Sequence, residues 1–159
     1  MPRKRVREKY RCMGEEMNEV VAIANDHAGF ALKQALLPVV RACGFAVRDL
    51  GTHSADSVDY PDYGRMVAET VARDEAIFGL AICGSGIGIS IAANRIPGAR
   101  AALCFTEEAA TLARQHNDAN ILALGARLIS ESDAIRITQT FLTTAFEGGR
   151  HAARVAKLG

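Results

Sequence analysis

Cys83 begins the segment Cys-Gly-Ser-Gly-Ile-Gly, in which glycines follow a single cysteine at alternate positions. Gly84, Gly86 and Gly88 would let the backbone approach a ligand closely, and amides that open a helix present partial positive charge to an anion. The same field would favour a thiolate at Cys83, suited to act as a base or a nucleophile. The structural alternatives are a tight strand-to-helix connection for the glycines and a buried core thiol for the cysteine.

The spacing of these glycines disfavours two common nucleotide-binding motifs. It lacks the later glycine of the dinucleotide fingerprint, and no Lys-Ser or Lys-Thr pair follows as a P-loop requires. A phosphatase of the Cys-x5-Arg kind is also disfavoured, because Ile89 stands six residues after Cys83. No arginine is therefore placed to hold a phosphoryl group in that manner.

Two histidines lie in settings that suit acid–base chemistry. His27 follows Asp26, as in a site where a carboxylate orients an imidazole, although histidines beside aspartates are also common on surfaces. His116 lies in the polar segment R-Q-H-N-D-A-N at 114–120, directly before an expected strand. The side chains of this segment either converge on a pocket or cap the adjoining helix and turn.

A basic cluster follows near the end of the chain. Arg150 and Arg154 stand four positions apart and therefore share one face of an expected helix. With His151 they would form a cluster able to bind phosphate through bidentate contacts. The alternative is a solvated basic tail.

These residues must be positioned by the elements around them. Short β-branched or apolar runs alternate with longer amphipathic stretches from residue 19 onward, which is typical of β-α-β units in a parallel sheet. Strands are expected at 20–24, 45–50, 77–82, 101–104 and 119–124, and helices over 30–43, from 61, around 89–92, at 107–114 and at 131–146. Ligands of such sheets bind at the carboxyl ends of the strands. The polar residues expected there are Asp26, His27, Cys83 and Ser85.

Composition indicates one compact domain. The chain has 159 residues, 49% of them hydrophobic and 23% charged, which is near the common size of a single domain. No run approaches the roughly 18 apolar residues that cross a bilayer, and no secretion signal opens the chain, so we expect a cytoplasmic protein. Four cysteines without paired spacing predict reduced thiols and no structural zinc site.

The first residues differ in charge from the rest. Residues 2–11 hold six lysines and arginines against Glu8 alone, within a net charge of +1. Such a short arm could touch nucleic acid, but no folded reader follows it, so nucleic acid is not an expected partner. We expect residues 1–18 to be a basic leader that is disordered or is an artefact of the assigned start, with Met13 or Met17 as the true start, and residues 19–159 to form the functional domain with a C-terminal helical tail.

Five motifs occur together in a fixed order: N-D-H-A-G-F at 25–30, D-Y-P-D-Y at 59–63, I-C-G-S-G-I-G-I-S-I-A-A-N at 82–94, R-Q-H-N-D-A-N at 114–120 and G-G-R-H-A-A-R at 148–154. In these motifs the chain resembles the ribose-5-phosphate isomerase B family, which also includes galactose-6-phosphate and allose-6-phosphate isomerases. The resemblance covers residues 19–156. It favours the functional interpretations above over the structural ones.

The resemblance implies a three-layer, Rossmann-like α/β sandwich around a five-stranded parallel sheet. It implies a homodimer or a dimer of dimers, with active sites completed by both subunits and with no metal or organic cofactor. The implied reaction interconverts ribose 5-phosphate and ribulose 5-phosphate through a cis-enediolate. Cys83 would take the proton from C2, and the hydroxyl of Ser85 would move a proton between the two oxygens.

The resemblance also assigns the other site residues. His116 with Asp26 would assist opening of the cyclic sugar, and the amides of Gly84, Gly86 and Gly88 would hold the enediolate oxygen. The residues that would bind sugar hydroxyls are Tyr60 and Asn117. The residues that would bind phosphate are His27, Arg127, Arg150 and Arg154.

Two alternatives concern the substrate and the activity. One branch of the family has glycine in place of the cysteine and glutamate at the position of Ile89, so Cys83 and Ile89 together indicate the cysteine-base branch. His53 stands where some close relatives carry tryptophan, in a loop near the sugar end of the site. The substrate is therefore ribose 5-phosphate or another sugar phosphate, such as allose 6-phosphate, galactose 6-phosphate or erythrulose 4-phosphate. A non-catalytic sugar-phosphate-binding subunit is the remaining alternative.

Overall fold

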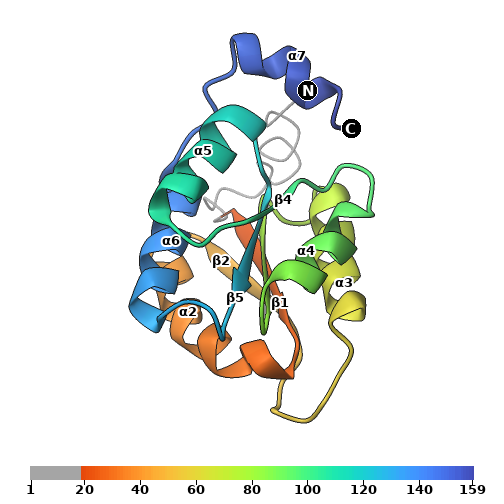
Figure 1. Cartoon of the computed structure of the whole chain (residues 1–159), viewed down its shortest axis with the longest axis vertical. Coiled ribbons are helices and arrows are strands. Elements are labelled where there is room, and N and C mark those ends of the chain that lie inside the picture. The colour runs from red at the N-terminus through yellow and green to blue at the C-terminus, as the bar shows by residue number, and fades with distance from the viewer. Residues whose placement is uncertain (1–18) are drawn as a thin grey trace, which may run out of the picture.

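A five-stranded parallel sheet forms the centre of the computed structural model, which describes residues 19–159 (Figure 1). The leader expected at 1–18 lies outside the described residues. The strand order is β2-β1-β3-β5-β4. The strands are β1 (Val20–Asn25), β2 (Ala46–Gly51), β3 (Phe78–Cys83), β4 (Ala101–Leu103) and β5 (Ile121–Gly125). The predicted α/β fold with a five-stranded parallel sheet is confirmed.

Helices cover both faces of this sheet. Figure 1 shows α3 and α4 on one side and α2, α5 and α6 on the other, with α7 set off beyond α5. The helical elements are the 3-10 helix η2 (His27–Gly29), α2 (Phe30–Ala42), α3 (Tyr60–Ala72), α4 (Ile87–Asn94), α5 (Glu107–Asn117), α6 (Glu131–Thr143) and α7 (Arg150–Ala156). Among residues 19–159, no helix combines the length and apolarity needed to span a bilayer.

Two of the three inner strands, β3 and β5, are apolar along their whole length because a helical layer packs on each face. Every residue of β3 and β5 is buried. On one face Leu36 and Phe141 belong to a core built from α2, α6 and the sheet, and on the other Val67 and Ile89 belong to a second core beneath α3 and α4. These cores hold the strand ends rigidly, as a site at the edge of the sheet requires.

Two predicted helix ends are wrong by three residues: the helix expected at 107–114 continues to Asn117, and the helix expected at 131–146 ends early. The helix expected at 131–146 ends at Thr143, because Thr144 takes an extended conformation. The carbonyl of Thr144 accepts a hydrogen bond from Arg114 Nε of α5 at 3.2 Å, a distant contact that helical periodicity cannot reveal.

Candidate active site

The turn after β3 carries the candidate base. Cys83 is the last residue of the strand and its side chain is buried, with 3% exposure. Its Sγ accepts a hydrogen bond from the backbone N–H of Gly86 at 3.2 Å. Gly86 has a φ of 76°, and a Cβ there would lie 2.5 Å from Leu103 Cδ1, so this N–H reaches the sulfur only because the residue is glycine.

The other two glycines of the turn lie close to Arg127 and Tyr60, two side chains that the family resemblance assigns to the site. A Cβ at Gly84 would lie 3.1 Å from Arg127 Nη1, and the Arg127 N–H donates to the Gly84 carbonyl at 2.9 Å. A Cβ at Gly88 would lie 2.5 Å from the ring of Tyr60, which begins α3. Arg127 and Tyr60 therefore flank the cysteine turn on two sides.

Asp26 and His27 lie at the end of the neighbouring strand. Register pairs Asn25 of β1 with Ile82 of β3, and the Asp26 N–H donates to the Ile82 carbonyl at 3.0 Å. The buried Asp26 carboxylate accepts the Gly29 N–H at 3.2 Å and so caps η2. His27 Nδ1 accepts the Val58 N–H at 3.2 Å, which leaves the proton of a neutral ring on Nε2.

Ser85 completes this group at the carboxyl ends of the strands. Its Oγ accepts the N–H of Ile87 at 3.2 Å, at the start of α4. The Cys83 thiol, the Ser85 hydroxyl and the first amides of α4 thus lie together in one turn. Such an arrangement can remove a carbon-bound proton and stabilise the negative charge that develops on a neighbouring oxygen.

His116 and Asn117 lie at the opposite edge of the sheet in the same chain. They end α5, and the chain then enters β5 at Ile121, whereas Cys83 pairs with Gly125 at the far end of that strand. Four strand rises of about 3.3 Å separate the two ends of β5, or about 13 Å before the turn is added. One copy of the chain therefore does not bring His116 to Cys83.

His116 belongs instead to a cluster with the C-terminal elements. Its ring stacks on that of His151 from α7, with 4.3 Å between centroids and 15° between planes. Glu147 Oε2 lies 3.5 Å from His151 Nε2. Burial lowers the pKa of His151, and its electrostatic interactions with His116 and Arg150 lower it further.

Arg150 and Arg154 begin and continue α7, and both are exposed. Both interact electrostatically with His151, which stacks on His116, at the end of the molecule where Figure 1 shows α7. The predicted site residues are thus divided between two regions. Asp26, His27, Tyr60, Cys83, Gly84, Ser85, Gly86, Gly88 and Arg127 lie at the strand ends, and His116, Asn117, Arg150 and Arg154 lie at the ends of α5 and α7.

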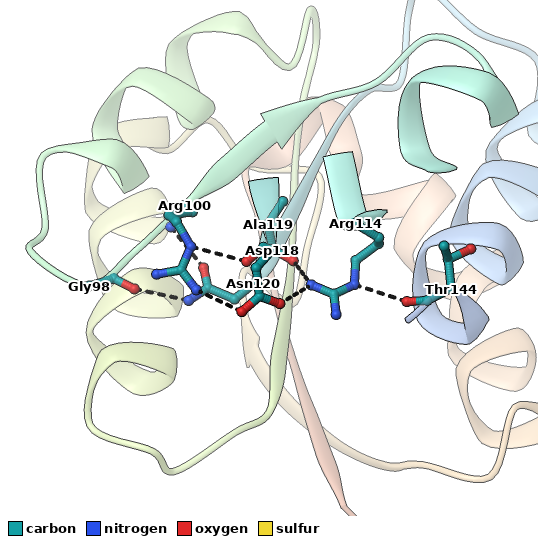
Figure 2. Close-up of polar contacts among 7 residues, drawn as sticks. All are labelled: Gly98, Arg100, Arg114, Asp118, Ala119, Asn120 and Thr144. Carbon is teal, nitrogen blue, oxygen red and sulfur yellow. Dashed lines mark hydrogen bonds and ion pairs between the residues drawn. The ribbon is translucent and has the colours of Figure 1, made fainter. Parts of the chain in front are cut away.

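A buried arginine holds the segment that follows His116, and the sequence pattern did not predict it. Figure 2 shows Arg114 donating to Asp118 Oδ1 at 2.9 Å, to the Ala119 carbonyl and to Thr144. Arg114 is fully buried and its guanidinium lies 4.8 Å from the ring centre of Phe78. Its charge-assisted bonds fix the left-handed residue Asp118 that ends α5.

On the other side of the same turn, Arg100 supports the start of β5. Figure 2 shows its Nε donating to the Asp118 carbonyl at 3.0 Å, while its backbone N–H donates to Asn120 Oδ1 at 2.8 Å. The Asn120 amide in turn donates to the Gly98 carbonyl at 2.9 Å. The polar residues 118 and 120 of the motif are therefore structural, whereas His116 stacks on His151 and Asn117 is exposed.

A buried lysine supports the loop beside His27, and it too was not predicted. Lys33 of α2 is fully buried, and its Nζ donates to Asp49 Oδ1 at 3.0 Å and to the Thr52 carbonyl. The only sequence signal for it is a charged residue on the apolar face of a helix, next to Leu32. It ties the end of β2 to the segment that leads to Val58.

Comparison with known proteins places these features in a wider group. A family model described as Ribose/Galactose Isomerase matches residues 21–158. The ribose-5-phosphate isomerase B of Escherichia coli is 44% identical over 135 residues, covering 85% of this chain and 91% of that protein. The type B ribose 5-phosphate isomerase structure from Trypanosoma brucei has a TM-score of 0.87 at 48% identity, covering 89% of this chain and 97% of that one. The Thermotoga maritima ribose 5-phosphate isomerase structure has a TM-score of 0.84 at 50% identity, covering 88% and 97%.

Proposed function

The chain belongs to the ribose/galactose isomerase family, and we propose that it interconverts ribose 5-phosphate and ribulose 5-phosphate with Cys83 as the base. It is a sugar-phosphate isomerase, and hence an intramolecular oxidoreductase. The choice of ribose 5-phosphate is supported by relatives at 44–50% identity that carry that name. The choice of base is supported by the buried Cys83 sulfur, which accepts the Gly86 N–H at 3.2 Å in a helix-starting turn.

The proposed reaction moves one proton between adjacent carbons. Cys83, as the thiolate, takes the C2 proton of the open-chain aldose, and the electron pair of that bond forms the enediolate while the C1 carbonyl becomes an oxyanion. The amides of Gly84 to Gly88 stabilise that oxygen, a contribution of about 10² to 10³ in rate per donor in other enzymes. Ser85 passes the O2 proton to O1, and the Cys83 thiol returns its proton to C1.

The remaining roles follow the chemistry of each side chain. We assign opening of the cyclic sugar to His116 acting with Asp26, because a neutral imidazole can remove the anomeric hydroxyl proton. Tyr60 and Asn117 are assigned to sugar hydroxyls. The residues assigned to the phosphate are His27, Arg127, Arg150 and Arg154.

This division of roles requires a second copy of the chain. Cys83 and His116 lie at opposite edges of one sheet, so a complete site forms only where the α5–α7 end of one subunit meets the strand ends of another. An apolar surface next to the cysteine turn supports such a dimer. Ile87 and Ile91, one helical turn apart on α4, are 49% and 59% exposed. We infer a homodimer with two shared sites, working in the reducing cytoplasm that keeps Cys83 a free thiol.

A comparison of substrates tests the proposal. Purified protein without added metal is assayed on ribose 5-phosphate, allose 6-phosphate, galactose 6-phosphate and erythrulose 4-phosphate. We expect the highest kcat/KM on ribose 5-phosphate. A higher value on another sugar would keep the mechanism but overturn the substrate, since one carbon unit changes binding by only about 1 to 3 kcal/mol. Inactivity on all four would favour a non-catalytic sugar-phosphate-binding subunit.

A further inference from the structure

Three side chains that can bind a metal ion meet at the end of the molecule away from Cys83. They are His116 at the end of α5, Glu147 in the segment between α6 and α7, and His151 in α7. One ligand atom from each lies within 4.8 Å of the others. The Glu147 N–H also donates to the Gln115 carbonyl at 3.1 Å, which holds the carboxylate-bearing residue against α5.

The middle member of this cluster has an unsatisfied nitrogen. His151 is buried, with 7% exposure, and within the described residues its Nε2 has no hydrogen-bond partner. That atom lies 3.5 Å from Glu147 Oε2, close enough for both to bind one ion. Buried polar atoms nearly always make a hydrogen bond, so a buried nitrogen that makes none, beside a carboxylate and next to a second imidazole, indicates a missing ligand.

We propose that a divalent transition-metal ion with the ligand preference of zinc binds His116, Glu147 and His151. Two imidazoles and one carboxylate are a common zinc ligand set that leaves a fourth position for water. Tetrahedral bonds of about 2.0 to 2.1 Å put ligand atoms about 3.4 Å apart, which the Glu147–His151 pair already matches. The half-buried His116 ring, which stacks on His151, would have to turn out of this stack to supply the third ligand.

Nearby charge limits the strength of this site. Arg150 and Arg154 act electrostatically on His151 and repel a cation, while the Glu147 carboxylate attracts it. The site is therefore weaker than a structural zinc centre and is occupied only when free metal rises. The ion is not a cofactor for turnover.

The consequence for activity rests on the proposed function. A metal-bound His116 cannot exchange a proton with the sugar, and the ion would occupy the half-site that a second subunit offers to the substrate. Zinc binding is thus expected to inhibit the isomerase. The test separates binding of the metal from inhibition, so that the two can fail independently.

Binding is measured by calorimetry, with Zn²⁺ titrated into the full-length Cys83→Ala protein. This substitution removes the proposed catalytic thiol as a competing ligand. We expect one ion per chain, and at least about tenfold weaker binding in Cys83→Ala/Glu147→Gln, since loss of even an outer-shell partner costs about 10- to 100-fold. Glu108→Gln, which changes another exposed glutamate, is the matched control and should leave binding unchanged. Equal affinity with and without Glu147, or binding that requires Cys83, would overturn the site.

Inhibition is measured on ribose 5-phosphate with the cysteine restored. Glu147→Gln should keep the basal rate, and the zinc concentration that inhibits it should rise by at least about tenfold. Zinc should inhibit Glu108→Gln at the same concentration as it inhibits the original protein. Binding without inhibition would keep the metal site and overturn its effect on turnover. An inactive protein that still binds zinc through Glu147 would reject the proposed isomerase function and leave the metal site standing.

Discussion

Two buried cysteines at strand ends differ in what their sulfur atoms do. Cys83 Sγ accepts an N–H, whereas Cys104, directly after β4, donates its S–H toward the Ala102 carbonyl at 3.7 Å. Burial raises the pKa of the Cys104 thiol to about 11. Cys104 is therefore a neutral thiol near pH 7 and a poor candidate for the catalytic base.

The raised pKa of Cys104 predicts a pH-dependent loss of stability. Below pH 9.0 the thiol is protonated in both folded and unfolded chains, but between pH 9.0 and about 11 it ionises mainly in the unfolded chain. Its contribution to the free energy of unfolding is therefore full below pH 9.0 and lost as the pH rises through about 11. The difference in that free energy between the original protein and Cys104→Ala should fall by about 2 kcal/mol over this window. Urea unfolding at each pH measures it, and a constant difference would contradict the prediction.

His116 is predicted to act on the ring form of the substrate. His116→Asn should lower kcat/KM by about 10²-fold on ribose 5-phosphate, whose ring must open, because asparagine cannot exchange the proton. The loss should be much smaller on erythrulose 4-phosphate, which stays open because it has no hydroxyl that could close a five- or six-membered ring onto its C2 carbonyl. Coupled kinetics with the two substrates measure the difference. Equal losses would indicate that His116 only positions the sugar.

At the scale of elements, the turn between β3 and α4 depends on one backbone conformation. Gly86 caps α4 in the left-handed region, and its N–H reaches Cys83. A Cβ there would lie 2.8 Å from the carbonyl carbon of Leu124 as well as against Leu103, both in packed strands. The end of the Leu103 side chain can rotate away, but the Leu124 backbone cannot move without disturbing the sheet.

Gly86→Ala is therefore expected to destabilise the fold by about 2 to 4 kcal/mol, from a positive φ together with overpacking. The control Gly44→Ala also has a positive φ, of 92°, but nothing lies within 4 Å of the added Cβ. It should cost only about 1 kcal/mol. Urea denaturation compares the two, and similar costs would show that the close approach at Gly86 can relax.

The elements were largely predictable from sequence because their signals are local. Apolar runs located all five strands, and glycines after a cysteine located the strand-to-helix turn. Contacts between distant residues had no such signal. Arg114 bonds a carbonyl 30 residues away, and Lys33 a carboxylate 16 residues away, so the burial of both charges could not be predicted.

At the scale of the whole molecule, the sequence predicted which residues form the candidate site but not that one chain places them in two separate regions. Residues at the carboxyl ends of the strands assemble as the topology dictates, and Arg127 joins them because it follows β5. His116 lies beyond the amino end of β5, where α5 returns the chain. The partner of His116 within the chain is His151, in an element too distant in sequence for any pattern to indicate.

Shared active sites predict recovery of activity from two inactive variants. Cys83→Ala and His116→Asn are each expected to be inactive or nearly so as homodimers. In a mixed dimer one site carries both changes and the other carries neither. Random pairing of equal amounts should therefore restore about one quarter of the original activity, half of the dimers having one of two sites intact. The two variants are co-expressed and the mixture is assayed. If its activity is only the sum of the two variants' separate activities, both residues act in a site formed by one subunit.

The role of Cys83 in proton transfer is tested most directly by following ribose 5-phosphate in D₂O by proton NMR, with the original protein and with Cys83→Ala. The original protein should interconvert aldose and ketose and place solvent deuterium on the carbons that exchange the proton. Cys83→Ala should lower both rates by about 10² to 10⁴, the usual contribution of a general base, while retaining affinity for inorganic phosphate. Turnover and deuterium incorporation at the original rate without the thiol would contradict the assignment.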